Sequence, residues 1–253
     1  MSDIAKVVLG ISFIFVMTSL GALTSFLFKD KVSVKFNKLI VGFSSGIMIA
    51  ASIWSLLLPA IDGASNYGSL KFLPAVLGFF VGGLFLALID FICKKLNHGG
   101  MKKSSKLFLA MTLHNIPEGI AVGVAFGSAW ATGDASAMAL ALSLAIGMGV
   151  QNFPEGMAIA LPMKQATGSK TKGFFMGVLS GLVEPIGAII GFFLAASITV
   201  IMPWALSFAA GAMIYVVVSE LFPESQVGEG ASLGTWGTML GFMLMMALDV
   251  GLG

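Results

Sequence analysis

Eight long apolar stretches constrain this chain more strongly than any other feature of its sequence. Each approaches the ~20 residues that an α-helix needs to cross the hydrocarbon core of a bilayer, and together they fill most of the 253 residues. We therefore predict an all-α fold, a polytopic membrane helix bundle of eight transmembrane helices that forms one domain over residues 1–253. The predicted spans are Ile4–Phe28, Leu39–Ile61, Phe72–Leu96, Lys106–Trp130, Ala135–Met163, Lys172–Ala196, Ile201–Leu221 and Ser232–Gly251.

The composition agrees with a membrane protein. The chain is 57% hydrophobic and only 10% charged, with a mean hydropathy of +0.99, well outside the range of soluble domains. We expect a multi-pass protein of the cell membrane, either plasma or inner, with the lipid bilayer as a partner and no nucleic acid. Cys93 is the only cysteine, which excludes disulfides within the chain and metal sites built from several thiolates.

The basic residues are distributed unevenly along the chain. All 14 are lysines, and if successive connections alternate between the two sides, every lysine except Lys6 and Lys71 falls on one side. Cytoplasmic loops carry the excess of positive charge, so this side is predicted to be cytoplasmic and both termini to lie outside. The polar, basic link at about residues 97–105 is then a cytoplasmic loop.

Two copies of a polar motif interrupt the fourth and fifth spans. A charged side chain at membrane depth costs at least about 2.5–3.5 kcal/mol, so its default interpretation is a functional site. Glu184, which precedes Pro185 in the sixth span, is a third intruding carboxylate. The two copies read His114-Asn115-Ile116-Pro117-Glu118-Gly119 and Gln151-Asn152-Phe153-Pro154-Glu155-Gly156.

The spacing of the motif puts its polar side chains on one face of each helix. Residues four apart are neighbours on a helix, so His114 lies beside Glu118, and Gln151 beside Glu155. Counted from the nearest lysine at about 1.5 Å per residue, both pairs and Glu184 reach a similar depth. Each motif proline also removes a helix hydrogen bond and frees a carbonyl one turn earlier. The expected free carbonyls are those of Leu113, Val150 and Gly181.

This polar set predicts a cation site, because no lysine lies near enough to neutralise its carboxylates. Oxygen with imidazole suits borderline divalent metals such as Zn²⁺, Fe²⁺ or Mn²⁺. Glu118 and Glu155 could each bridge two metal positions. His114 and Gln151 would then complete one position, and Asn115, Asn152 and Glu184 the other. The alternative is that these polar groups only cross-link helices.

The paired motifs, with Glu184-Pro185, resemble those of the Zrt/Irt-like (ZIP) divalent metal transporters in their short bacterial form. The resemblance implies a 3+2+3 helix arrangement, a binuclear metal centre between spans four and five, and metal movement into the cytoplasm. It assigns His114, Glu118, Gln151 and Glu155 to the primary metal position. It assigns Asn115, Asn152 and Glu184, with both glutamates, to the second. It further suggests an outer approach at Asp62 and Asp249 and an inner exit at Asp90 and Glu220.

We therefore expect a transporter of divalent metal, zinc preferred and iron, manganese or cadmium as alternatives, without enzymatic activity or a separate cofactor. Two other functions are open to the same residues: a proton-coupled carrier of a small organic solute, and an intramembrane metalloenzyme. Only one histidine lies within a predicted span, whereas zinc hydrolases usually require more. The glycine-rich faces could support a homodimer.

Overall fold

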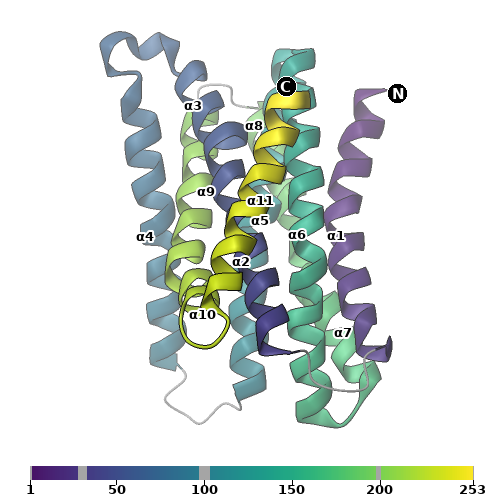
Figure 1. The fold of residues 1–253 in the computed structure, drawn as a ribbon. Helices are drawn as coiled ribbons and strands as arrows, with labels where there is room; N and C mark the ends of the chain where they lie inside the picture. The colour runs from purple at the N-terminus through teal and green to yellow at the C-terminus, as the bar shows by residue number, and fades with distance from the viewer. Residues whose placement is uncertain (1, 28–32, 97–102, 198–200, 253) are drawn as a thin grey trace.

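The computed structural model describes residues 2–27, 33–96, 103–197 and 201–252, and it shows a bundle of long helices that run side by side (Figure 1). Every regular element in these ranges is helical. In chain order the elements are α1 (Asp3–Leu27), α2 (Val34–Ala51), the π-helical η1 (Ser52–Leu57), α3 (Leu58–Gly63), the 3₁₀ turn η2 (Ser65–Leu70), α4 (Phe72–Leu96), α5 (Lys103–Thr132), α6 (Ala135–Thr167), α7 (Lys170–Gly181), α8 (Val183–Ser197), α9 (Met202–Val216), the π-helical η5 (Val217–Leu221), α10 (Phe222–Gln226) and α11 (Ala231–Leu252).

Seven helical segments in the described part of the chain are long and apolar enough to cross a membrane. They are α1; α2 with η1 and α3; α4; α6; α7 with α8; α9 with η5 and α10; and α11. This confirms an all-helical, multi-pass membrane fold. The fourth predicted span corresponds to α5, a 30-residue helix that carries the first motif copy and is not among the seven. The count of eight therefore stays a prediction.

The predicted loop at residues 97–105 overlaps the start of α5. Residues 97–102 lie outside the described residues, but α5 already begins at Lys103.

Short polar turns reverse the chain between neighbouring helices. Asp134 begins α6, where its carboxylate accepts a hydrogen bond from the backbone N–H of Ser136 at 2.9 Å. Gly168 ends the same helix with a φ of 68°, a left-handed conformation that glycine adopts without steric cost. Ser169 then caps α7 by accepting from the N–H of Lys172 at 3.3 Å. Capped ends and a tight turn set α6 and α7 antiparallel.

The helices pack closely as four pairs: α1 with α6, α5 with α8, α2 with α11, and α4 with α9. Each interface contains glycines that lie directly against a backbone carbonyl of the partner helix. A Cβ added to Gly42 would collide with the carbonyl of Gly234, and one added to Gly119 with that of Glu184. Small residues allow such close approach in membranes. The interfaces therefore depend on the absence of side chains at these positions.

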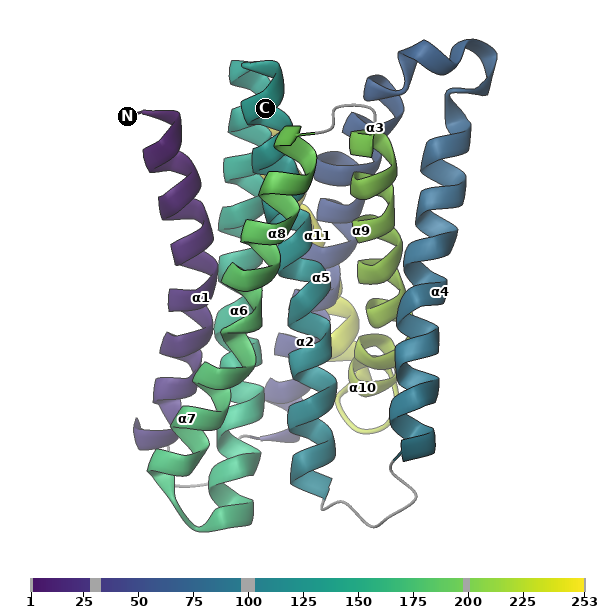
Figure 2. The ribbon, with the colours of Figure 1, turned by 180° about the vertical axis from the view of Figure 1, so that it is seen from behind.

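The two termini lie at the same end of the bundle (Figures 1 and 2). The link from α3 through η2 to α4 lies at that end too, whereas the turn between α6 and α7 lies at the opposite end. The described lysines at the start of α2, the end of α4 and both sides of the α6–α7 turn consequently gather at the end away from the termini. This is the distribution on which the predicted orientation depends.

Candidate metal centre

The two motif copies meet inside the bundle. Gln151 on α6 donates a hydrogen bond from Nε2 to Oε1 of Glu118 on α5, at 3.0 Å. The exposed fractions of Gln151, Glu118 and Glu155 are 0%, 1% and 7%, so none of the three faces lipid. The structure thus brings together the polar faces that the motif spacing predicted.

Glu184, at the start of α8, joins both motif copies. Its Oε1 accepts from Asn115 Nδ2 on α5 at 3.0 Å and from Thr18 Oγ1 on α1 at 2.8 Å. Its Oε2 accepts from Asn152 Nδ2 on α6 at 2.7 Å. One buried carboxylate therefore holds side chains from three other helices. Sequence reasoning missed Thr18, since a lone threonine in an apolar helix usually bonds to its own backbone.

The helical hydrogen bonding of the sixth span is interrupted next to Glu184. Between α7 and α8, Leu182 keeps right-handed helical angles, with φ −64° and ψ −23°, but Pro185 cannot supply a backbone donor. The carbonyl used by the site there is that of Ser180, which accepts from Asn115 Nδ2 at 3.0 Å. The free carbonyl expected at Gly181 stays a prediction. Pro117 and Pro154, by contrast, lie inside continuous helices.

Several buried oxygens at this centre have no hydrogen-bond donor among the residues that the structure describes. They are Oδ1 of Asn115, Oε2 of Glu118, Oε1 of Gln151 and Oδ1 of Asn152. Buried polar atoms nearly always have a partner, so four such oxygens at one depth require an explanation. Carboxylate and amide oxygens are donors to divalent cations, and a bound cation would satisfy them.

Carboxylates alone do not complete a metal site here. Among the described side chains, no three His, Cys, Asp or Glu residues are close enough together to hold a metal ion. The side chain of His114 lies outside the described residues, so its predicted role as a ligand is untested. Glu118 does interact electrostatically with Glu155 and Glu184. A cation held here would need amide oxygens, His114 or both in addition to the glutamates.

A further buried carboxylate belongs to none of the hydrogen bonds of this centre. Asp249 on α11 is 2% exposed, and its Oδ1 accepts from Ser55 Oγ on η1 at 2.8 Å and from Ser143 Oγ on α6 at 2.7 Å. Its Oδ2 has no donor within the described part of the chain. Asp62, the other predicted outer residue, is exposed near the end of α3. Neither serine could be identified from the sequence, since hydroxyls are common in membrane helices.

The predicted exit residues lie in the other half of the molecule. Asp90 is half-buried in the last turns of α4, where Tyr215 donates its hydroxyl to Oδ2 at 3.4 Å. Glu220 is half-buried within the π-helical segment η5. Segments of this kind occur frequently at functional sites.

A family model described as "ZIP Zinc transporter" matches residues 102–249, a range that includes both motif copies and Glu184. The chain belongs to the ZIP zinc transporter family. It is 33% identical to the zinc transporter ZIP11 of Homo sapiens, over 100% of this chain and 98% of that protein. It is 38% identical to the zinc transporter GufA of Myxococcus xanthus, over 93% and 94% of the two chains.

Another zinc transporter matches as well. The zinc transporter ZupT of Lysinibacillus sphaericus is 35% identical, over 92% of each chain. The resemblance drawn from the motifs is thereby confirmed. Membership of the ZIP family gives no support to the metalloenzyme alternative.

Proposed function

We propose that this ZIP family member moves divalent metal cations into the cytoplasm, with Zn²⁺ preferred and Fe²⁺, Mn²⁺ or Cd²⁺ as alternatives. The observation that carries the proposal is the set of four buried oxygens without donors, contributed by both motif copies. A purely structural cross-link would pair these atoms with donors. A transported cation would pair with them only while it is bound, and it must also be able to leave.

The hydrogen bonds support two adjacent metal positions. Gln151 contacts Glu118, whereas Asn115 and Asn152 both contact Glu184. A binuclear centre requires two such sets of ligands, one for each metal ion. Glu118 and Glu155 would be shared by both ions. His114 would complete the first position. Deprotonated carboxylates and neutral imidazole bind metal best, so uptake is expected to weaken as the pH falls.

The helix pairs support eight spans in a 3+2+3 arrangement. With α5 counted as the fourth span, the first packs on the fifth and the sixth on the fourth; the second packs on the eighth and the seventh on the third. Exchanging the first three spans for the last three, and the fourth for the fifth, reproduces the same pairs. Such internal symmetry is common in transporters, whose sites lie between the repeats.

The remaining acidic residues fit the two ends of a path. Asp249 is buried, and its free oxygen suits a cation on its way from the outer side, where Asp62 is exposed. Asp90 and Glu220 would receive it on the inner side. A homodimer stays a prediction, and its original basis is weaker, since Gly42 and Gly119 pack against helices of the same chain.

The test is metal uptake by purified protein in lipid vesicles. We expect Glu118→Gln/Glu155→Gln to abolish Zn²⁺ uptake, because it removes both bridging charges while preserving side-chain size. Zn²⁺ should also raise the melting temperature of the unmodified protein and not that of this variant. The matched control is Glu229→Gln, at an exposed glutamate that pairs only with exposed Lys35 at 3.7 Å. Normal uptake by the double variant would rule out the proposal.

A further inference from the structure

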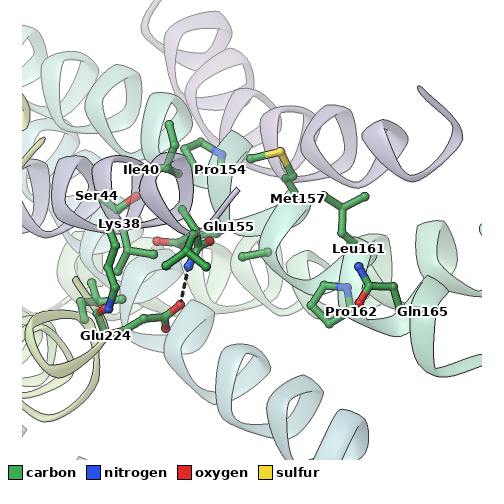
Figure 3. Close-up of a pocket in the computed structure, with 15 residues that line it drawn as sticks. Lys38, Ile40, Ser44, Pro154, Glu155, Met157, Leu161, Pro162, Gln165 and Glu224 are labelled. Carbon is green, nitrogen blue, oxygen red and sulfur yellow. Dashed lines mark hydrogen bonds between the residues drawn. The ribbon is translucent and has the colours of Figure 1, made fainter. Parts of the chain in front are cut away.

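A cavity of about 460 Å³ lies between α2, α6 and the segment of η5 and α10. Figure 3 shows its labelled lining residues. Most of the lining is apolar. The polar side chains are those of Asn37, Lys38, Ser44, Glu155, Gln165 and Glu224.

The cavity extends from the metal centre to one end of the bundle. Glu155, a proposed bridging ligand, lines its inner part, and exposed Glu224 and Gln165 line its outer part. The outer part lies near the start of α2 and the end of α6, the end where most described lysines gather. By the charge rule that end is cytoplasmic. The cavity therefore connects the proposed site with the cytoplasmic side.

Ser44 is the unusual residue of this cavity. It is 2% exposed, and its Oγ has no hydrogen-bond partner among the described residues. Serines in apolar helices usually bond to the carbonyl one turn earlier, and the neighbouring serines do so. Ser45 donates to the carbonyl of Val41 at 2.8 Å, and Ser52 to that of Met48 at 2.7 Å. Ser44 instead lines the same cavity as Glu155.

At the cytoplasmic opening of the cavity, side chains of α2 form hydrogen bonds with α10 and the residue that follows it. Asn37 Nδ2 donates to Glu224 Oε1 at 2.9 Å, the bond drawn in Figure 3. Lys38 donates from Nζ to the carbonyl of Glu224 and, at 2.8 Å, to that of Val227. The ammonium of Lys38 is thus bound to backbone oxygens beside a carboxylate, and that carboxylate offsets its repulsion of a passing cation.

On the basis of the transport function proposed above, we propose that Ser44 is a further ligand for the transported cation, in the cavity through which the cation passes from Glu155 to the cytoplasm. A neutral hydroxyl beside one carboxylate binds a divalent cation more weakly than the motif centre does. Weak ligation is suited to release, since conduction requires that each site let the ion go.

The test compares Ser44→Ala with the matched control Ser45→Ala in reconstituted vesicles. We expect the first variant to lower the maximal rate of Zn²⁺ uptake roughly fivefold, the factor that corresponds to about 1 kcal/mol for one lost polar contact. The control should retain the normal rate.

In a Cys93→Ser background, Ser44→Cys should raise the ratio of Cd²⁺ to Mn²⁺ uptake, because a thiolate prefers the softer ion.

The shift in metal ratio separates ligation from a structural effect, which would slow both ions alike. Equal rates for Ser44→Ala and Ser45→Ala, or an unchanged ratio for Ser44→Cys, would overturn the role of Ser44. Those results would leave the transport function intact. That function fails only if the glutamate double variant takes up metal normally.

Discussion

Glu184 shows at the residue scale how the bundle accommodates a carboxylate. It is 0% exposed, and an isolated charge at such a position would be costly. Hydrogen bonds from Thr18, Asn115 and Asn152 reach both of its oxygens. These donors offset part of the cost of burying the carboxyl group. Thr18 is the one donor of the three that lies outside the motif.

Thr18→Val tests this support, because valine has nearly the same shape and lacks the hydroxyl. Losing a buried hydrogen bond is expected to cost about 0.5–1.5 kcal/mol of unfolding free energy, and the melting temperature in detergent should fall accordingly. The control is Thr24→Val on the same helix, where the buried hydroxyl donates only to the carbonyl of Gly21. Equal losses in the two variants would show that Thr18 gives Glu184 no special support.

The candidate site could be predicted from the sequence only in part. Glu118, Glu155 and Glu184 stand out because a charge in an apolar stretch is rare. Thr18 and Ser44 do not, since hydroxyls are common in membrane helices and usually bond to their own backbone. Whether a given hydroxyl does so depends on how its helix is rotated against its neighbours. That rotation is a property of packing and is not encoded in local spacing.

At the scale of elements, the packing of α5 on α8 leaves no room for a side chain beside the metal centre. Gly119 lies one residue after Glu118, directly against the carbonyl of Glu184. Gly119→Ala should therefore push the two helices apart, at a cost of about 1–3 kcal/mol for overpacking. It should also weaken Zn²⁺ binding, measured by calorimetry on purified protein.

The control is Gly83→Ala in α4. A Cβ there would meet only the carbonyl of Gly211, at an ordinary 3.7 Å, and alanine is a better helix former than glycine. We expect unchanged stability and binding. Unchanged stability and Zn²⁺ binding in Gly119→Ala would contradict this prediction, because they would show that the site does not depend on the close approach of α5 and α8.

The elements themselves were largely predictable. The third predicted span coincides with α4, Phe72–Leu96, because the apolar stretch ends sharply at both sides. The interruption of helical hydrogen bonding at Leu182 and the π-helical segments η1 and η5 were not predicted. Proline marks a possible break, but Pro117 and Pro154 leave their helices continuous. Only the surrounding packing decides between these outcomes.

At the scale of the whole molecule, the distribution of charge and the position of the cavity define two different ends of the bundle. The lysine-rich end lies opposite the termini, and the cavity below Glu155 opens toward it. The buried Asp249 lies toward the other end, in the last turns of α11. The proposed path, from Asp249 through the motif centre to the Ser44 cavity, would therefore cross the bundle from end to end. Its direction depends on which end faces the cytoplasm.

Cysteine labelling determines that orientation. In a Cys93→Ser background, Asn66→Cys places a thiol in the exposed η2 turn and Ala166→Cys places one near the exposed end of α6. With the lysine-rich end inside, a membrane-impermeant maleimide added to intact cells should label the cysteine at position 66. The cysteine at position 166 should react only after permeabilisation. Reversed labelling would place the Ser44 cavity on the outer side, so that the same path would run out of the cell.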